Sequence, residues 1–240
     1  MERMASHDLL PVALRAYAPP NDRRPSHRRA DRYHRPDLMF VFDTETTIDA
    51  AQALTFGSWR VHERRANAAA ESPEYDLIEE GIFYADDLAN EHRAILREYV
   101  RRHWYDNNVE LQLMTRREFV DRVFWRRAYR ERALTVGFNL PFDLSRIAVE
   151  CGEARHGLYV GGFSFAIWDY LDQASAGRLE NRYRPRITIK TIDGKRHLIS
   201  FTAPRETDFI DRIPDGAHGQ KPDEKYTFRG HFLDAHTLAF

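Results

Sequence analysis

The sequence has a single cysteine in 240 residues, Cys151, and this scarcity excludes an internal disulfide. It has no Cys-x-x-Cys pair and no histidine pair with zinc spacing, which argues against a zinc module. No apolar run approaches the ~18 residues that a membrane span requires, and no signal-peptide pattern opens the chain. We therefore predict a cytoplasmic protein that has no membrane partner.

The sequence also lacks a strong net charge, since its formal charge is −1 at pH 7. Hydrophobic residues make up 42% and charged residues 30%, which is ordinary for a soluble globular protein. A chain of this length suits one domain, with or without appendages. The low net charge hides an uneven distribution, because arginine and histidine are concentrated near the N-terminus.

Residues 1–36 carry this basic segment. They contain too little apolar surface to offset the entropy of ordering, so we predict a disordered basic arm. Six arginines between residues 23 and 35 follow the breaker Pro19-Pro20. Such an arm can contact the phosphates of a nucleic acid. The alternative is a disordered leader with an arginine bias and no binding role.

The sequence does contain an apolar run, Leu38 to Phe42, that predicts a buried strand ending in two carboxylates. Asp43 and Glu45 follow, separated by one residue, and residues i and i+2 of a strand point to the same side. Two carboxylates this close repel each other unless a cation lies between them, and Mg²⁺ or Mn²⁺ prefers oxygen ligands. The alternative is a strand end with solvated carboxylates, since Asp-x-Glu occurs about once by chance in such a chain.

The following residues predict an α/β fold. Strand patterns at 54–63 and 81–85 complete an antiparallel meander with the first strand. Helical periodicity covers 88–104 and 116–130, and Thr115 with Glu118 forms a capping box before the second helix. We expect Asp87 to cap the first helix.

A second carboxylate follows another predicted strand, Leu134 to Phe138. The next three residues break this strand, and apolar spacing predicts a helix from Leu144 to Cys151. Asp143 therefore lies at a strand-to-helix junction, where open α/β sheets place their ligands. The alternative is an N-cap role for Asp143, and the two roles are compatible.

Residues 155–227 predict a β-rich insertion. Its strongest signal is a hairpin of 187–192 and 196–201 around Asp193-Gly194. The insertion can shape a substrate groove or only extend the sheet. A polar loop at 214–225 precedes a last strand at 228–233, after which Asp234 should cap a helix.

Residues 37–240 resemble the DEDD superfamily of 3′–5′ exonucleases. Phe40 to Thr46 is similar to the first motif of that family, with its Asp-x-Glu. Val136 to Leu144 is similar to the second motif, an Asn followed four residues later by Asp, about 100 residues downstream of the first. Within the superfamily the likeness is to the proofreading domain of family B DNA polymerases. That domain also has a β-rich insertion and an Asp-x-x-x-Leu-Ala pattern similar to 234–239.

The resemblance implies an RNase H-like mixed sheet, an antiparallel meander plus parallel strands, flanked by helices. It implies 3′–5′ hydrolysis of single-stranded DNA ends by two metal ions, Mg²⁺ or Mn²⁺. Asp43, Glu45 and Asp143 would be the catalytic residues and metal ligands. The nucleotide-binding residues would be Thr44, Asn139 and Phe142, with core packing as the alternative for Phe142. The partners would be single-stranded DNA, or RNA, and a downstream polymerase domain.

This chain departs from the family pattern at the third motif. That motif brings a fourth carboxylate, four residues after a Tyr or His, on the helix that follows the strand ending near Asp234. No residue here can be assigned to it, and Asp234 is better interpreted as a helix cap or as a support for the ligands. We expect an exonuclease domain that is truncated or completed by a partner. Two alternatives stay open: a catalytically incomplete nucleic-acid-binding module, and a nuclease of the same fold that acts on RNA or cuts internally.

Overall fold

A computed structural model of the chain describes residues 36–66, 74–172, 174, 176–203 and 228–238. The chain divides into two compact units, 1–34 and 35–240, and all described residues lie in the second. Nearly all of the predicted basic arm, as far as residue 35, and the predicted polar loop at 214–225 lie outside the described residues.

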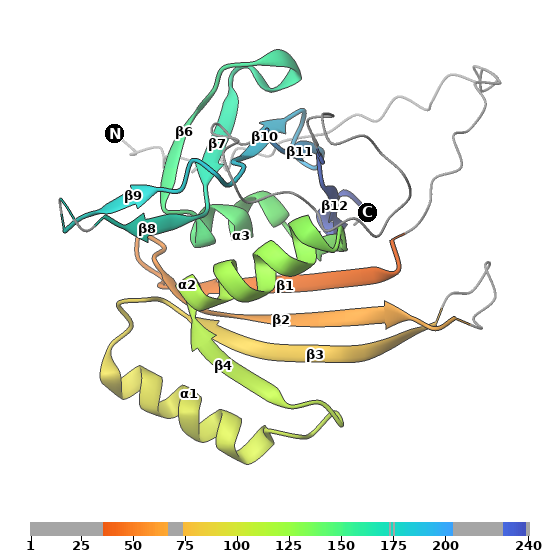
Figure 1. The fold of residues 1–240 in the computed structure, drawn as a ribbon, viewed down its shortest axis with the longest axis vertical. Helices are drawn as coiled ribbons and strands as arrows, with labels where there is room; N and C mark the ends of the chain where they lie inside the picture. Colours follow the sequence, from red (N-terminus) through yellow and green to blue (C-terminus); the bar gives the residue numbers. More distant parts are fainter. Residues whose placement is uncertain (1–35, 67–73, 173, 175, 204–227, 239–240) are drawn as a thin grey trace, which may run out of the picture. The chain divides into compact units, whose positions relative to one another are not determined.

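The main sheet has six strands in the order β12-β5-β1-β2-β3-β4 (Figure 1). Strands β1, β2 and β3 form an antiparallel meander, β5 and β12 run parallel to β1, and β4 runs parallel to β3. The predicted α/β class and mixed sheet are therefore confirmed. The bounds are β1 Leu38–Thr46, β2 Leu54–Arg64, β3 Tyr75–Tyr84, β4 Leu111–Thr115, β5 Leu134–Gly137 and β12 His231–Asp234.

The side chains of β1 alternate between the two faces of the sheet. Phe40, Phe42 and Thr44 are buried, whereas Asp43 and Glu45 are exposed. This is the alternation that the sequence predicts, because successive side chains of a strand point to opposite faces.

The buried face of β1 packs against a helix that crosses the sheet (Figure 1). It begins as α2, Arg116–Glu118, and continues as the π-helix η1, Phe119–Arg130. The rings of Phe119 and Phe83 stack with centroids 4.0 Å apart, so the helix is joined to β3 as well. The predicted capping box of Thr115 and Glu118 is confirmed.

Helix α1, Asn90–His103, differs from its prediction. Ala89 occupies the N-cap position and no side chain makes a cap hydrogen bond, so the expected cap by Asp87 is wrong. None of its residues is buried, and Ile95 of its apolar stripe is 65% exposed. Strand β4, which pairs with β3, was not among the predicted strands.

Helix α3, Leu140–Ile147, begins four residues earlier than predicted. Pro141 lies in its first turn, where the missing N–H costs nothing because that donor has no helical partner. Asn139 is the N-cap, so the N-cap alternative for Asp143 is wrong. Cys151 lies on strand β6 and is exposed, not on the buried stripe of a helix.

The segment after α3 forms a four-stranded sheet in the order β11-β10-β7-β6 and a separate pair of β8 with β9. The predicted hairpin is confirmed, with Ile187 opposite Phe201. The buried indole of Trp168 donates a hydrogen bond to the carbonyl of Val120, which ties this segment to η1. The elements of this segment are β6 Glu150–Ala154, η2 Gly157–Tyr159, β7 Gly162–Ala166, β8 Asp169–Leu171, β9 Arg178–Glu180, β10 Ile187–Thr191 and β11 His197–Phe201. The short helix η3, Ala235–Leu238, follows β12.

None of the helices in the described part of the chain has the length and apolar character that crossing a membrane would need.

Candidate functional site

The two carboxylate motifs meet at one edge of the main sheet. Strands β1 and β5 are parallel neighbours, with Val41 beside Val136, so their carboxyl ends lie side by side. The first strand ends in Asp43 and Glu45, and the second leads through a turn into α3. The fold therefore brings together segments that are about 100 residues apart in the sequence.

Asp143 is the most deeply buried carboxylate of this edge. It is 1% exposed, and its Oδ1 accepts hydrogen bonds from Thr44 N at 3.2 Å and from Thr44 Oγ1 at 2.7 Å. The turn that carries it depends on Asn139, whose φ of 66° is left-handed. Asparagine tolerates this left-handed conformation better than most residues. The conformation turns the backbone from the end of β5 into the start of α3.

Asp43 and Glu45 lie on the other side of β1. Thr44 points to the buried face, and Asp143 contacts it there, whereas Asp43 and Glu45 point to the exposed face. Within the described ranges, no group of three His, Cys, Asp or Glu residues is arranged to hold a metal ion. The three predicted ligands are thus not assembled in advance as one three-residue site.

The electrostatics of Asp143 nevertheless couple it to other carboxylates. The pKa of Asp143 is raised to about 7, chiefly by burial; the Thr44 hydrogen bonds lower it, and the charges of Asp43 and Asp234 raise it. Its second oxygen, Oδ2, is buried and has no hydrogen-bond partner among the described atoms. A cation near this oxygen would provide a partner for Oδ2 and would lower the pKa of Asp143.

Asp234, at the end of β12, belongs to the same edge. Its Oδ1 accepts hydrogen bonds from Asn139 N at 2.9 Å and from His236 N at 3.1 Å. The bond to His236 agrees with the predicted cap role, but the bond to Asn139 was not foreseen. The sequence signal was present, because Asp234 follows an apolar strand just as Asp43 does.

The residues predicted to bind a nucleotide have different environments. Thr44 is 7% exposed and is engaged by Asp143, whereas Asn139 is exposed and its side chain makes no cap hydrogen bond. Phe142 is half-buried and lies outside the core cluster, so core packing does not describe it. The guanidinium of Arg146 lies 4.7 Å from the centroid of its ring.

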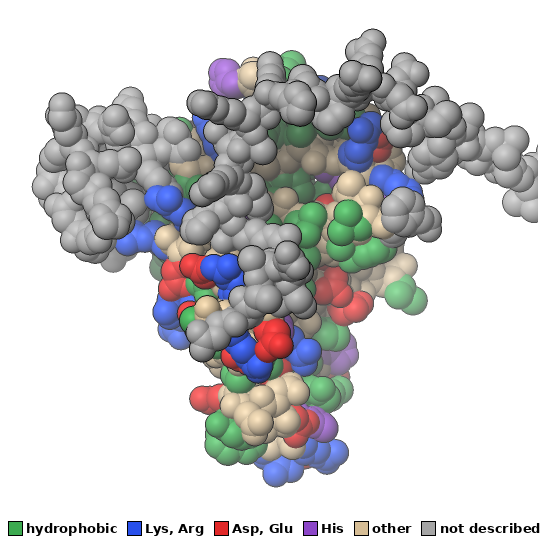
Figure 2. Space-filling model, turned by 90° about the vertical axis from the view of Figure 1, so that its right-hand side faces the viewer, with side chains coloured by type: hydrophobic (Ala, Val, Ile, Leu, Met, Phe, Trp, Pro, Cys, Tyr) green, Lys and Arg blue, Asp and Glu red, His purple; other side chains and the backbone are tan. Residues whose placement is uncertain are grey.

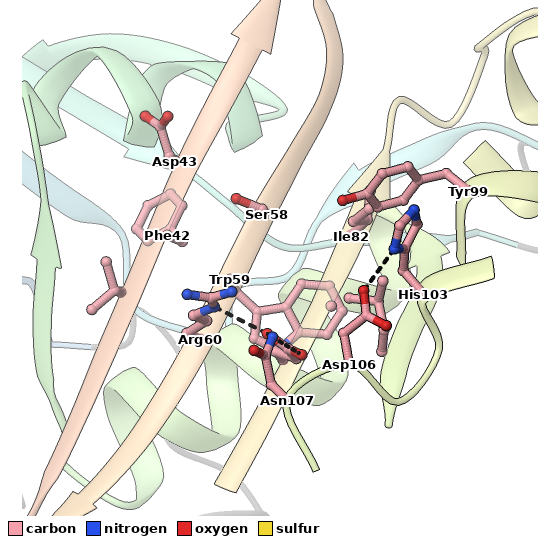
Figure 3. Close-up of a pocket in the computed structure, with 14 residues that line it drawn as sticks. Phe42, Asp43, Ser58, Trp59, Arg60, Ile82, Tyr99, His103, Asp106 and Asn107 are labelled. Atoms are coloured by element: carbon pink, nitrogen blue, oxygen red, sulfur yellow. Dashed lines mark hydrogen bonds and ion pairs between the residues drawn. The ribbon is translucent and has the colours of Figure 1, made fainter. Parts of the chain in front are cut away.

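A cavity of about 370 Å³ opens on the exposed face of β1, β2 and β3. Figure 3 shows Asp43 at one end of it, Ser58 beside it on β2, and Tyr99 and His103 of α1 at the other end. Glu80 forms its floor, in contact with Arg60 and with Asn107 Nδ2 at 2.8 Å. Sequence analysis did not anticipate this cavity, because its walls come from elements that no local pattern connects.

The chain matches no protein-family model, no curated protein and no solved structure. Among the described residues visible in Figure 2, acidic and basic side chains are interspersed, so their charge alone marks no nucleic-acid surface there. The chemistry of the site therefore has to be inferred from its own donors.

These donors fit a hard divalent cation in kind. They are carboxylate oxygens, which Mg²⁺ and Mn²⁺ prefer, and one of them is the unpartnered Oδ2 of Asp143. In the described part of the chain they are not part of a preformed group of three His, Cys, Asp or Glu residues.

Proposed function

We propose that this chain is an RNase H-like domain for 3′–5′ exonuclease-type hydrolysis of single-stranded DNA ends, working beside a downstream polymerase domain. The observation that carries the proposal is the pair of hydrogen bonds from Thr44 to Asp143. They bring the carboxylate of the second motif to the strand end that bears Asp43 and Glu45. Local sequence patterns alone do not require this meeting.

The sheet supports the same proposal. Its order β12-β5-β1-β2-β3 combines an antiparallel meander with parallel strands on the other side of β1. This is the arrangement that the resemblance to the DEDD superfamily implies. Strand β4 adds one parallel strand beyond β3.

In the proposed reaction, Asp43, Glu45 and Asp143 would hold the cations. Mg²⁺ or Mn²⁺ bound there supplies positive charge at the phosphate and acidifies water. Glu45 would orient the attacking water and accept its proton at the carboxylate. Thr44 fixes the carboxylate of Asp143 through two hydrogen bonds, which is the preorganisation that such a reaction requires.

The terminal nucleotide would lie near the start of α3. The exposed amide of Asn139 can donate and accept hydrogen bonds, and the half-buried ring of Phe142 can contact a base. The cavity beyond Asp43 provides a path for the strand, and Tyr99 on its wall is 49% exposed and available for stacking.

The test is cleavage of 5′-labelled single-stranded DNA in Mn²⁺ by the 240-residue chain and by its Asp43→Asn variant. We expect the parent to shorten the DNA from its 3′ end and the variant to be about 100-fold slower or worse. Asp87→Asn is the matched control, because Asp87 is exposed and lies outside the site. Equal rates for the parent and Asp43→Asn would overturn the assignment.

A second candidate is a nucleic-acid-binding module that does not cut. It is favoured by the absence of a preformed three-residue metal group in the described ranges. Retention of labelled DNA without shortening would support it. Parallel assays with end-blocked and free-ended DNA and RNA would separate both candidates from a nuclease that acts on RNA or cuts internally.

A further inference from the structure

Two buried carboxylates at the sheet edge each have one oxygen without a partner. Asp143 is 1% exposed and Asp234 is 7% exposed. In both residues Oδ2 is buried and accepts no hydrogen bond from any described atom. Leaving a buried charged oxygen unpaired is costly, so such atoms indicate a missing ligand or proton.

The two carboxylates lie beside the same residue, Gly137. Asp234 lies directly beside Gly137 in the parallel pair of β12 and β5, and such neighbours project their side chains to the same face. A Cβ atom on Gly137 would lie 3.5 Å from Oδ2 of Asp143. Both carboxylates therefore lie near the end of β5. Neighbouring strands of a sheet are about 4.8 Å apart. Leu140 Cδ1, 2.8 Å from the same Cβ position, and the backbone oxygen of Phe42, 3.4 Å from it, border this space as well.

The hydrogen bonds at this place engage only one oxygen of each acid. Oδ1 of Asp143 receives two hydrogen bonds from Thr44, and Oδ1 of Asp234 receives one from Asn139 N and one from His236 N. Each carboxylate thus has one satisfied oxygen and one open oxygen.

One open oxygen of this pair, Asp234 Oδ2, has an ion-pair partner in His197, which is charged only when it is protonated. His197 Nε2 is 4.0 Å from Oδ2 of Asp234, which is too far for a hydrogen bond, and its Nδ1 interacts with Thr191 Oγ1 at 3.1 Å. The charge of Asp234 also raises the pKa of Asp143, which agrees with their proximity. A cation between the two Oδ2 atoms would therefore stabilise both carboxylates.

We propose that Asp143 and Asp234 bind one divalent cation of the Mg²⁺ or Mn²⁺ class between their Oδ2 atoms, above Gly137. Two carboxylates suffice for such an ion, because it keeps several of its waters. Asp234 thereby becomes a metal ligand in addition to the three carboxylates of the proposed function. The inference shares Asp143 with that function and rests on it in no other way.

The test is a titration of the 240-residue chain with MnCl₂ alone, in which isothermal calorimetry measures binding. Asp234→Asn keeps an oxygen for Asn139 N and removes the charge, and we expect its affinity for Mn²⁺ to fall about tenfold or more. Asp87→Asn, an exposed control, should bind as the parent does. The proposal is overturned if the parent binds no Mn²⁺ at millimolar concentration. That result is expected if the two acids share a proton instead of a cation. The proposal is equally overturned if folded Asp234→Asn binds with unchanged affinity.

A measurement on the parent chain covers the case in which Asp234→Asn does not fold. Mn²⁺ broadens NMR signals of nearby nuclei, and His197 lies beside the proposed ion. We expect its ring signals to broaden at substoichiometric Mn²⁺ before those of His92, which is exposed on α1. Simultaneous broadening of both histidines would contradict the site.

The same variants separate this inference from the proposed function. If Asp43→Asn abolishes DNA cleavage while Asp234→Asn binds Mn²⁺ normally, the function stands and the cation site fails. If Asp234→Asn weakens Mn²⁺ binding while the parent cuts no nucleic acid, the cation site stands and the function fails.

Discussion

The hydroxyl of Thr44 donates a 2.7 Å hydrogen bond to Oδ1 of Asp143, a residue 99 positions away in the chain. The backbone N–H of Thr44 donates to the same oxygen at 3.2 Å. These two bonds join the end of β1 to the first turn of α3. They hold the carboxylate of Asp143, which is 1% exposed, against the end of β1.

Replacing Thr44 by valine tests the energetic weight of this link. Valine keeps the shape and removes the hydroxyl, so we expect the free energy of unfolding to fall by about 1.5–3 kcal/mol, as for a hydrogen bond to a charged group. Urea unfolding followed by circular dichroism measures the change. Thr55→Val is the matched control, because the Thr55 hydroxyl bonds an exposed backbone oxygen of Glu45. A loss no larger than that of the control would contradict the assigned role.

The raised pKa of Asp143 predicts a pH dependence of stability. Its ordinary value is 3.8 and its folded value is about 7, so the folded state binds the proton more tightly than the unfolded state. The stabilisation is complete below about pH 3.8 and is lost as the pH rises to 7, by up to about 4 kcal/mol. Asp143→Asn keeps the acceptor for Thr44 but cannot ionise.

The measurement is the free energy of unfolding of both proteins between pH 4 and pH 8 without metal. The stability of Asp143→Asn relative to the parent should increase over this window and then level off. A difference that does not change with pH would show that Asp143 has an ordinary pKa.

Glu45 offers a test that is independent of stability. Its side chain is exposed on β1, so Glu45→Gln should leave the free energy of unfolding within about 0.5 kcal/mol of the parent. If Glu45 accepts a proton from water in the proposed reaction, DNA cleavage should slow about 100-fold. Glu63→Gln, at another exposed strand position, should leave the rate unchanged. Equal rates for the two variants would remove Glu45 from the reaction.

Gly57 tests the packing beneath the site. A Cβ atom there would lie 2.3 Å from the ring of Phe83 and 2.5 Å from the backbone oxygen of Asp43. The backbone of Asp43 cannot yield without disturbing β1, so Gly57→Ala should destabilise the protein by about 1–3 kcal/mol. Thermal unfolding measures the loss, and Gly157→Ala would serve poorly as its control because Gly157 has a positive φ. Gly152→Ala, whose nearest neighbour is 3.8 Å away, is the matched control.

Several elements could be predicted because their signals are local. The hairpin of β10 and β11 follows from alternation around Asp193-Gly194, and the capping box of Thr115 and Glu118 follows from a four-residue pattern. Others could not. Strand β4 is short and is stabilised by pairing with β3, and the start of α3 depends on the left-handed Asn139 that Asp234 holds.

By itself, the sequence determined that Asp43 and Glu45 share a face of β1, because the two-residue repeat of a strand is a property of the backbone. Only the tertiary structure decided that Asp143 is buried against Thr44 and beside Asp234. Burial, hydrogen-bond partners and neighbouring charges come from strands and a helix that are distant along the chain. They set the state of that carboxylate, and no local pattern contains them.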